Sequence, residues 1–190
     1  MTAYGDEAPE IFFPDAAAFE AWLEKHVDHQ PGVWLKVAKK SSGIPSLTDD
    51  EAVDVGLCFG WISGQRRGLD ATYYLQKYVP RRPRSRWSQV NVRKVEELLT
   101  AGRMRPAGLA EVDAARADGR WDAAYVSQKE ATVPADLADA LAASPAAGTA
   151  FAALGKSEQY AVILDVVTAR NHATRESRIA RAVATLGTPA

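Results

Sequence analysis

The residues with the greatest capacity for chemistry are arginines and aromatics gathered between Gly60 and Val95. This segment holds nine Lys and Arg but one acid, Asp70, so its charge is +8 in a chain that carries −1 overall. Guanidinium groups bind phosphate or carboxylate through a planar fork of N–H donors. Aromatic rings offer flat surfaces on which bases or other rings stack. The pattern predicts a site for an anionic or aromatic ligand.

The predicted site lies between the stretches GWISGQRR (60–67) and PRRPRSRW (80–87). Prolines keep the second stretch extended, so that neighbouring arginine side chains diverge. The residues predicted to contact the ligand are Trp61, Gln65, Arg66, Tyr74, Arg81, Arg82, Arg84 and Trp87. Two alternatives remain open. The arginines pair with acids of other helices while the aromatics pack in the core, or the same basic surface binds nucleic acid.

A second basic cluster is predicted near the C-terminal end, from Arg170, Arg175, Arg178 and Arg181. Arg175 and Arg178 are three residues apart, so on a helix they share a face. A helix face that carries several guanidinium groups can bind an anion or the acidic helix of a partner. The alternative interpretation is an ordinary solvated face.

The remaining chemistry-bearing residues do not complete a catalytic or metal-binding set. Cys58 lies in an apolar run, which favours a buried, inert thiol. His26 and His29 are three residues apart, but no third ligand is close in sequence. Asp54 or Asp70 would serve as general acid or base in an alternative, hydrolase-like interpretation. We expect a non-enzymatic protein without catalytic residues, metal or cofactor.

Local patterns predict the elements that position these residues. Thr48 and Glu51 match a capping box, so a helix is expected from there to about residue 59. Two strands are expected at 61–66 and 72–79, joined as an antiparallel hairpin. Further elements are expected as follows: a helix over 16–26 capped by Asp15, a strand over 33–38, a helix over 88–101, and helices beginning at Pro106, Pro134, Pro145, Ser157 and Thr174.

These elements predict an α+β fold, with a small antiparallel β-sheet packed against helices and an all-helical C-terminal part. We expect an α+β domain over 1–126, a linker over 127–135 and a helical region over 136–190. The N-terminal residues lack the basic and apolar regions of a signal peptide. No apolar stretch approaches the roughly 18 residues that cross a bilayer. A cytoplasmic protein that is not inserted in a membrane is expected.

Six stretches of the chain together form a pattern found in a known family: PGVWLKVAKK (31–40), EAVDVGLCFGWISGQRR (51–67), YYLQKYVPRRPRSRWSQVNVRKVEEL (73–98), GRMRPAGLAEV (102–112), DGRWDAAY (118–125) and the C-terminal series from Tyr160 to Ile179. Through these stretches the chain resembles the YdeI/OmpD-associated family, also called bacteriocin-protection proteins. Ser63 stands where the family usually carries an acid, and Arg170 where it commonly carries a lysine.

The resemblance implies a role in tolerance of antimicrobial peptides or bacteriocins, but no reaction, cofactor or catalytic residue. Combined with the basic and aromatic segment, it predicts a binding protein for antimicrobial or stress tolerance. Its partner would be a small molecule, a peptide or another anionic ligand, with nucleic acid as the alternative.

Overall fold

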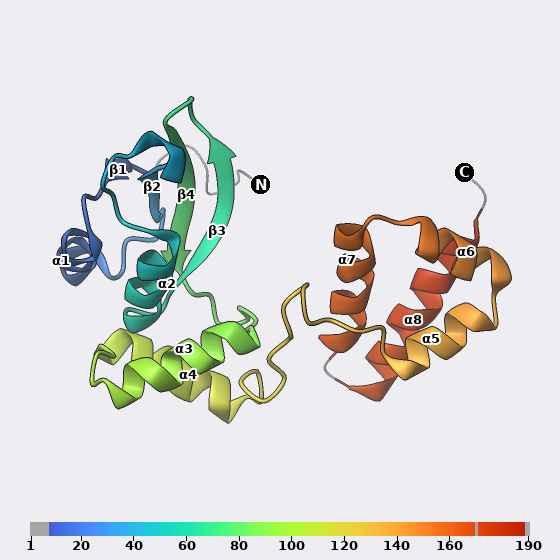
Figure 1. The fold of residues 1–190 in the computed structure, drawn as a ribbon. Coiled ribbons are helices and arrows are strands. Elements are labelled where there is room, and N and C mark those ends of the chain that lie inside the picture. The colour runs from blue at the N-terminus through green and yellow to red at the C-terminus, as the bar shows by residue number, and fades with distance from the viewer. Residues whose placement is uncertain (1–7, 170, 189–190) are drawn as a thin grey trace. The chain divides into compact units, whose positions relative to one another are not determined.

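The computed structural model describes residues 8–169 and 171–188, and the chain divides into two compact units (Figure 1). The first unit comprises residues 1–85 and 91–122, and the second comprises residues 86–90 and 123–190. Each unit has its own core.

A four-stranded sheet with the order β1-β2-β4-β3 forms the centre of the first unit. Its strands are β1 (Glu10–Phe12), β2 (Val33–Ala38), β3 (Trp61–Gly68) and β4 (Tyr73–Pro80). The predicted strand at 33–38 and the predicted antiparallel hairpin are confirmed. The short β1 was not predicted, and it pairs with β2 in parallel, so the sheet is mixed. The α+β fold class predicted from the sequence is confirmed.

Helices α1 (Ala16–His26) and α2 (Asp49–Cys58) lie against one face of this sheet (Figure 1). The side chain of Asp15 accepts a hydrogen bond from the backbone N–H of Ala18 at 2.8 Å and so begins α1. The capping box at Thr48 begins α2, because Thr48 Oγ1 accepts from the backbone N–H of Glu51 and Glu51 Oε2 accepts from that of Thr48. Both predicted helix starts are confirmed.

Helices α3 (Gln89–Thr100) and α4 (Pro106–Ala117) complete the first unit, except that the first two residues of α3 belong to the second. Helix α4 passes close to the end of α2, because a Cβ at Gly108 would lie 2.2 Å from the carbonyl oxygen of Cys58. Gly60 has a φ of +73°, which lets the chain turn from α2 into β3.

The second unit contains helices α5 (Ala135–Ala142), α6 (Pro145–Ala153), α7 (Lys156–Val167) and α8 (His172–Gly187). Its core consists of Leu137, Leu141, Ala147, Phe151, Ile163, Val166 and Ile179. Two predicted helix starts were wrong. Helix α7 begins after Gly155, whose backbone N–H donates to Glu158, and α8 begins after Asn171, whose side chain accepts from Thr174. Of the predicted linker, residues 127–134 carry no helix, and its last residue, Ala135, begins α5.

Residues 86–90, which include the first two residues of α3, belong to the second unit although the chain on both sides of them belongs to the first. Ser88 forms a parallel β-bridge with Tyr125. The backbone N–H of Gln89 donates to the carbonyl of Tyr125 at 2.8 Å, and the N–H of Tyr125 donates to the carbonyl of Trp87 at 3.1 Å. This bridge ties the start of α3 to the chain that leads toward α5.

Candidate functional site

Trp61, predicted to contact a ligand, lies in the core of the first unit. Its indole Nε1 donates to the carbonyl of Val27 at 2.9 Å, and its ring meets that of Trp22 edge to face, with 5.9 Å between centroids. The side chain is 1% exposed. In this arrangement Trp61 fastens β3 to the end of α1.

Arg66 and Tyr74 are brought together on the face of the sheet that carries α1 and α2. The guanidinium carbon of Arg66 lies 4.6 Å from the ring centroid of Tyr74. Asp49, in the first turn of α2, contacts both residues at 2.8 Å, accepting from the Tyr74 hydroxyl and pairing with Arg66. Burial, followed by the hydrogen bond to Asp49, raises the pKa of Tyr74 to about 12.

Gln65 lies in a β-bulge of β3, where the pairing with β4 shifts between Ser63 and Arg66. The buried side-chain amide of Gln76 donates to the carbonyls of Gly64 at 3.0 Å and Gln65 at 3.2 Å. The side-chain oxygen of Gln76 accepts from Arg66 Nε at 2.8 Å. One glutamine of β4 therefore closes the bulge.

Arg81, Arg82 and Arg84 lie in one turn after β4. The backbone N–H of Arg81 donates to the carbonyl of Gly60 at 2.9 Å, and the Arg81 side chain is buried. Arg82 and Ser85 close the turn: the N–H of Arg82 donates to Ser85 Oγ and the N–H of Ser85 donates to the carbonyl of Arg82. Arg82 and Arg84 are exposed. Trp87, the last predicted contact, is buried and belongs to the second unit.

Acids from outside the basic segment neutralise part of its charge. Arg66 pairs with Asp49 as described, and Arg67 pairs with Glu10 of β1 at 2.7 Å. Lys94 of α3 lies within 2.8 Å of two acids of α2, Asp50 and Asp54. The acids that pair with Arg66 and Lys94 come from helix α2, whereas the acid that pairs with Arg67 comes from strand β1.

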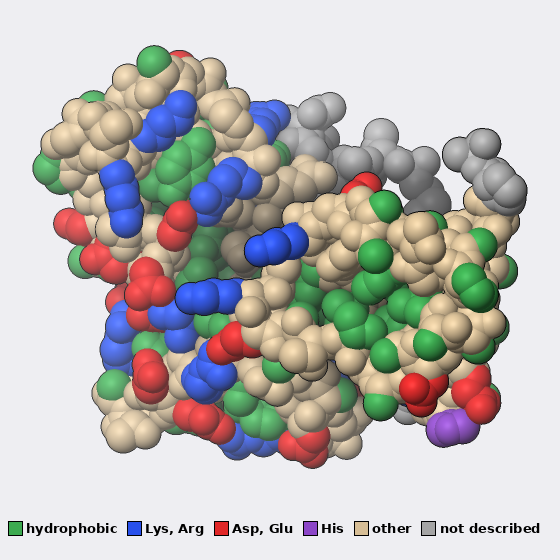
Figure 2. All heavy atoms as spheres, turned by 45° about the vertical axis from the view of Figure 1, so that its right-hand side comes forward, with side chains coloured by type: hydrophobic (Ala, Val, Ile, Leu, Met, Phe, Trp, Pro, Cys, Tyr) green, Lys and Arg blue, Asp and Glu red, His purple; other side chains and the backbone are tan. Residues whose placement is uncertain are grey.

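The opposite face of the sheet gathers a second set of cations over aromatic rings. Because side chains of neighbouring strands in register share a face, Trp34, Lys36, Tyr73, Lys77 and Arg67 lie on one side of the sheet. We name these five residues the basic–aromatic face. Figure 2 shows Lys and Arg side chains on several sides of a hydrophobic patch of the first unit.

Each cation of the basic–aromatic face lies above a ring. Arg67 and Lys77 lie 4.4 and 5.0 Å from the ring centroid of Trp34, and Lys36 lies 4.3 Å from that of Tyr73. Trp34 and Lys77 are buried, Lys36 and Tyr73 are half-buried, and Arg67 is exposed. Sequence reasoning left these residues out of the site. The signal was the alternation of Trp34 and Lys36 in a strand, which places both side chains on the same face.

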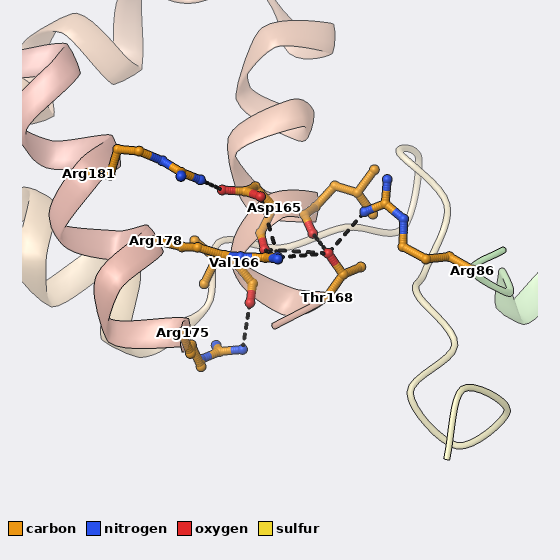
Figure 3. A network of polar contacts seen from close by, with 8 residues as sticks. Arg86, Asp165, Val166, Thr168, Arg175, Arg178 and Arg181 are labelled. Atoms are coloured by element: carbon orange, nitrogen blue, oxygen red, sulfur yellow. Dashed lines mark hydrogen bonds and ion pairs between the residues drawn. The ribbon is translucent and has the colours of Figure 1, made fainter. Parts of the chain in front are cut away.

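The predicted second cluster surrounds the C-terminal end of α7 (Figure 3). Arg175 binds Asp136 with two hydrogen bonds, of 2.6 and 2.9 Å, which hold the pKa of that carboxyl below its usual value. Arg178 donates to the carbonyl of Asp165 and to Thr168 Oγ1. Cations near the last carbonyls of a helix stabilise it through the helix dipole. Arg170 lies outside the described residues.

Arg181, also predicted for this cluster, and Arg86, which was not, complete the set. Arg181 pairs with Asp165 at 2.8 Å, and Arg86 Nη1 donates to Thr168 Oγ1 at 3.0 Å. Arg86 belongs to the same unit through the segment 86–90, so it reaches the end of α7 from a distant part of the sequence. Figure 3 shows these side chains converging on one helix end. The arrangement caps α7 and joins α5, α7 and α8.

Comparison with known families gives two matches that divide the chain. Residues 11–111 match a family described as a domain of unknown function (DUF8412), and residues 130–188 match the family described as bacteriocin-protection, YdeI or OmpD-associated. The chain belongs to the DUF8412 family and carries a YdeI/OmpD-associated domain. No curated protein and no solved structure matches the chain significantly.

The two matches refine the resemblance drawn from the sequence. The YdeI/OmpD-associated match covers the four helices of the second unit, including the Arg175 and Arg178 that cap α7. The stretches quoted from residues 31 to 111 fall in the DUF8412 match instead. The whole sheet except the first residue of β1 lies in the DUF8412 match, and so does the basic–aromatic face.

The acids considered for catalysis have structural partners in the DUF8412 region. Asp70 Oδ1 accepts from the backbone N–H groups of Tyr73 and Thr72, both at 2.7 Å, and these bonds lower the pKa of its carboxyl. Asp54 pairs with Lys94. Burial raises the pKa of the Cys58 thiol, which keeps it protonated. Within residues 8–169 and 171–188, no three His, Cys, Asp or Glu side chains form a metal-binding group.

One carboxyl group that sequence reasoning missed is Glu111 of α4. Its Oε2 atom is buried and has no hydrogen-bond partner among the described residues. Burial raises the pKa of the carboxyl although Arg120 and Arg81 oppose this effect.

No helix in the described part of the chain has both the length and the apolar character needed to cross a bilayer.

Proposed function

We propose that the chain is a non-enzymatic binding protein with a role in antimicrobial or stress tolerance. Its ligand is anionic and binds at the basic–aromatic face. The observation that carries the proposal is the placement of Lys36 above Tyr73 and of Arg67 above Trp34. The tolerance role is supported by the bacteriocin-protection description of the family that matches residues 130–188.

The chemistry of the face suits an anion. A ring beneath a cation restrains the cation in position and leaves its outward N–H donors available. Arg67 uses Nη2 to bind Glu10, which leaves further donors on its guanidinium. Lys36 has no carboxylate partner among the described residues. Together these two side chains form a pair of donor groups for carboxylate or phosphate oxygens.

Single-stranded nucleic acid is the second candidate ligand. The observation that favours it is the half-buried ring of Tyr73 on a strand with a cation beside it, since bases stack on such rings while cations bind the backbone. In that case affinity falls with salt, with a log–log slope of roughly −0.7 for each phosphate neutralised. A carboxylate ligand would show a shallower dependence.

Tryptophan fluorescence tests the proposal. The protein is titrated with oligothymidylate and, separately, with poly-glutamate, at low and at moderate salt. We expect saturable binding of one probe, weakened about tenfold or more by the double variant Lys36→Ala, Arg67→Ala. The matched control is Lys40→Ala with Arg103→Ala, which removes the same charge from exposed positions. If both double variants weakened ligand binding equally, the loss of affinity would follow from net charge alone, and a defined binding site would be refuted.

A cellular readout completes the test. Cells that carry the Lys36→Ala, Arg67→Ala variant should lose antimicrobial tolerance, whereas cells with the control variant should keep it. If the variant lost ligand binding but its cells kept their tolerance, ligand binding at this face would not be the cause of tolerance, and that part of the proposal would be wrong.

A further inference from the structure

The strand β3 forms an edge of the sheet, because in the order β1-β2-β4-β3 it pairs with no described strand other than β4. Residues 63–68 of this strand are exposed. Among the described residues, none donates or accepts a backbone hydrogen bond on the outer side of this stretch. Such an edge offers a row of N–H and C=O groups to another extended chain.

The β-bulge and its glutamine hold this edge in a fixed conformation. Gln76 is 6% exposed, and its amide bonds to the carbonyls of Gly64 and Gln65 keep the bulge closed. Beyond the bulge, the pairing with β4 resumes at Arg66 and continues to Gly68. An edge that is ordered beforehand loses little conformational entropy when a partner binds.

The charge of the edge selects the partner. Trp61–Gly68 contains two arginines and no acid, and Arg66 and Arg67 are adjacent, so their side chains lie on opposite faces of the sheet. Their ion pairs are half-exposed: the Arg66 and Asp49 side chains are 53% and 49% exposed, and those of Arg67 and Glu10 are 54% and 45%. Because exposed ion pairs are weak, an incoming carboxylate can replace Asp49 or Glu10.

We propose that β3 is a docking edge for an extended acidic peptide, which adds to the sheet as a fifth strand along residues 63–68. Two adjacent acidic residues of the peptide would face Arg66 and Arg67 on the two faces of the sheet. The backbone edge provides affinity, and the two arginines provide selectivity for acid. This inference shares Arg67 with the proposed function but does not rest on it, because the peptide is bound through the backbone edge of residues 63–68.

The experiment uses the full chain and a synthetic peptide of about eight residues, β-branched with a central Asp-Glu pair. Fluorescence anisotropy of the labelled peptide gives affinity, and amide hydrogen exchange reports on β3. We expect saturable binding with protection of those amides of residues 63–68 that point away from β4. Replacing Asp-Glu by Lys-Lys should weaken binding by about tenfold or more.

N-methylation of the peptide identifies backbone pairing. In an added strand, alternate residues direct their N–H groups toward β3. One of the two alternating sets of N-methyl groups should therefore abolish binding, while the other should leave it nearly unchanged. Equal binding by both N-methylated peptides would overturn the proposal, and so would failure to bind at concentrations of about 1 mM.

Two controls distinguish the β3 edge from other binding surfaces. Lys36→Ala should leave peptide binding unchanged, because Lys36 lies on β2 away from the edge. Loss of peptide binding in that variant would assign the peptide to the basic–aromatic face and overturn the docking edge without affecting the proposed function. Sedimentation without peptide tests for a second copy of the chain. A dimer that protects the same amides would overturn the acidic-peptide assignment.

Discussion

Replacement of Gly108 by alanine tests the contact between α4 and α2 most directly. Gly108 is buried, and a Cβ there would lie 2.2 Å from the carbonyl oxygen of Cys58 and 2.7 Å from that of Leu57. Real Cβ contacts are essentially never shorter than 3.0 Å, so the two helices cannot keep this separation. The neighbouring atoms are backbone and cannot rotate away.

The expected loss of stability follows from this geometry. To reach an ordinary contact of 3.4 Å, α4 must withdraw from α2 by about 1.2 Å. Overpacking of this kind costs about 1–3 kcal/mol. The withdrawal also strains the 3.0 Å hydrogen bond from the backbone N–H of Arg105 to the carbonyl of Cys58, worth about 1 kcal/mol. We expect Gly108→Ala to lower the free energy of unfolding of the first unit by about 2–4 kcal/mol.

Urea denaturation combined with amide hydrogen exchange measures this loss. At m-values typical of small proteins, the unfolding midpoint should fall by about 1–2 M urea. Exchange should increase in α2 and α4, while α5–α8 keep their protection. The control is Gly68→Ala, because a Cβ at Gly68 meets no atom within 4 Å. A loss below about 0.5 kcal/mol for Gly108→Ala, comparable to an ordinary surface change, would refute the contact.

Three further predictions follow from polar contacts. Trp61→Phe removes the donor to the partly buried carbonyl of Val27 and should lower the free energy of unfolding by about 1–3 kcal/mol, measured by urea denaturation. Arg175 lowers the pKa of Asp136 in the folded protein. The ionised carboxyl therefore contributes to the free energy of unfolding above pH 3.8, its ordinary pKa, and this contribution is lost as the pH falls through the lowered value. Asp136→Asn should remove this part of the acid dependence in thermal melts. The pKa of Tyr74 is raised to about 12, so the protonated hydroxyl contributes to the free energy of unfolding below pH 10, and this contribution is lost as the pH rises toward 12. In Tyr74→Phe this part of the alkaline loss of stability should be absent, as measured by circular dichroism.

The fold was predictable where a signal is local. Asp15 and the capping box at Thr48 act within three residues, so the sequence alone placed α1 and α2 correctly. The starts of α7 and α8 were misplaced, because several cap-forming residues lie close together and packing selects among them. Asn171 competes with Thr174 in this way. The parallel strand β1 was missed because three residues are too few for a periodic pattern.

The candidate site was predictable only in composition. The sequence indicated that cations and aromatics concentrate between residues 60 and 95, but the acids that pair with them come from elsewhere. Asp49 approaches Arg66 from α2, and Glu10 approaches Arg67 from β1. These partners depend on tertiary packing and leave no mark at a fixed spacing. The same holds for Trp34 of β2. The cations above its ring come from β3 and β4, and they reach the ring only when these strands pair beside β2.

The contact between Arg86 and Thr168 fixes an order of events during synthesis of the chain. The segment 86–90 leaves the ribosome before α4 and the rest of α3, yet Arg86 can contact its partner Thr168 only after α7 has been made. At about 5–20 residues per second, roughly 4–16 s separate the two. Helices α1 to α4 can assemble with the sheet in that interval, while the short segment waits. Helices α5 to α8 therefore complete the second unit by packing with residues 86–90, which were synthesised earlier. By then the neighbours of this segment in the sequence have had time to fold as part of the first unit.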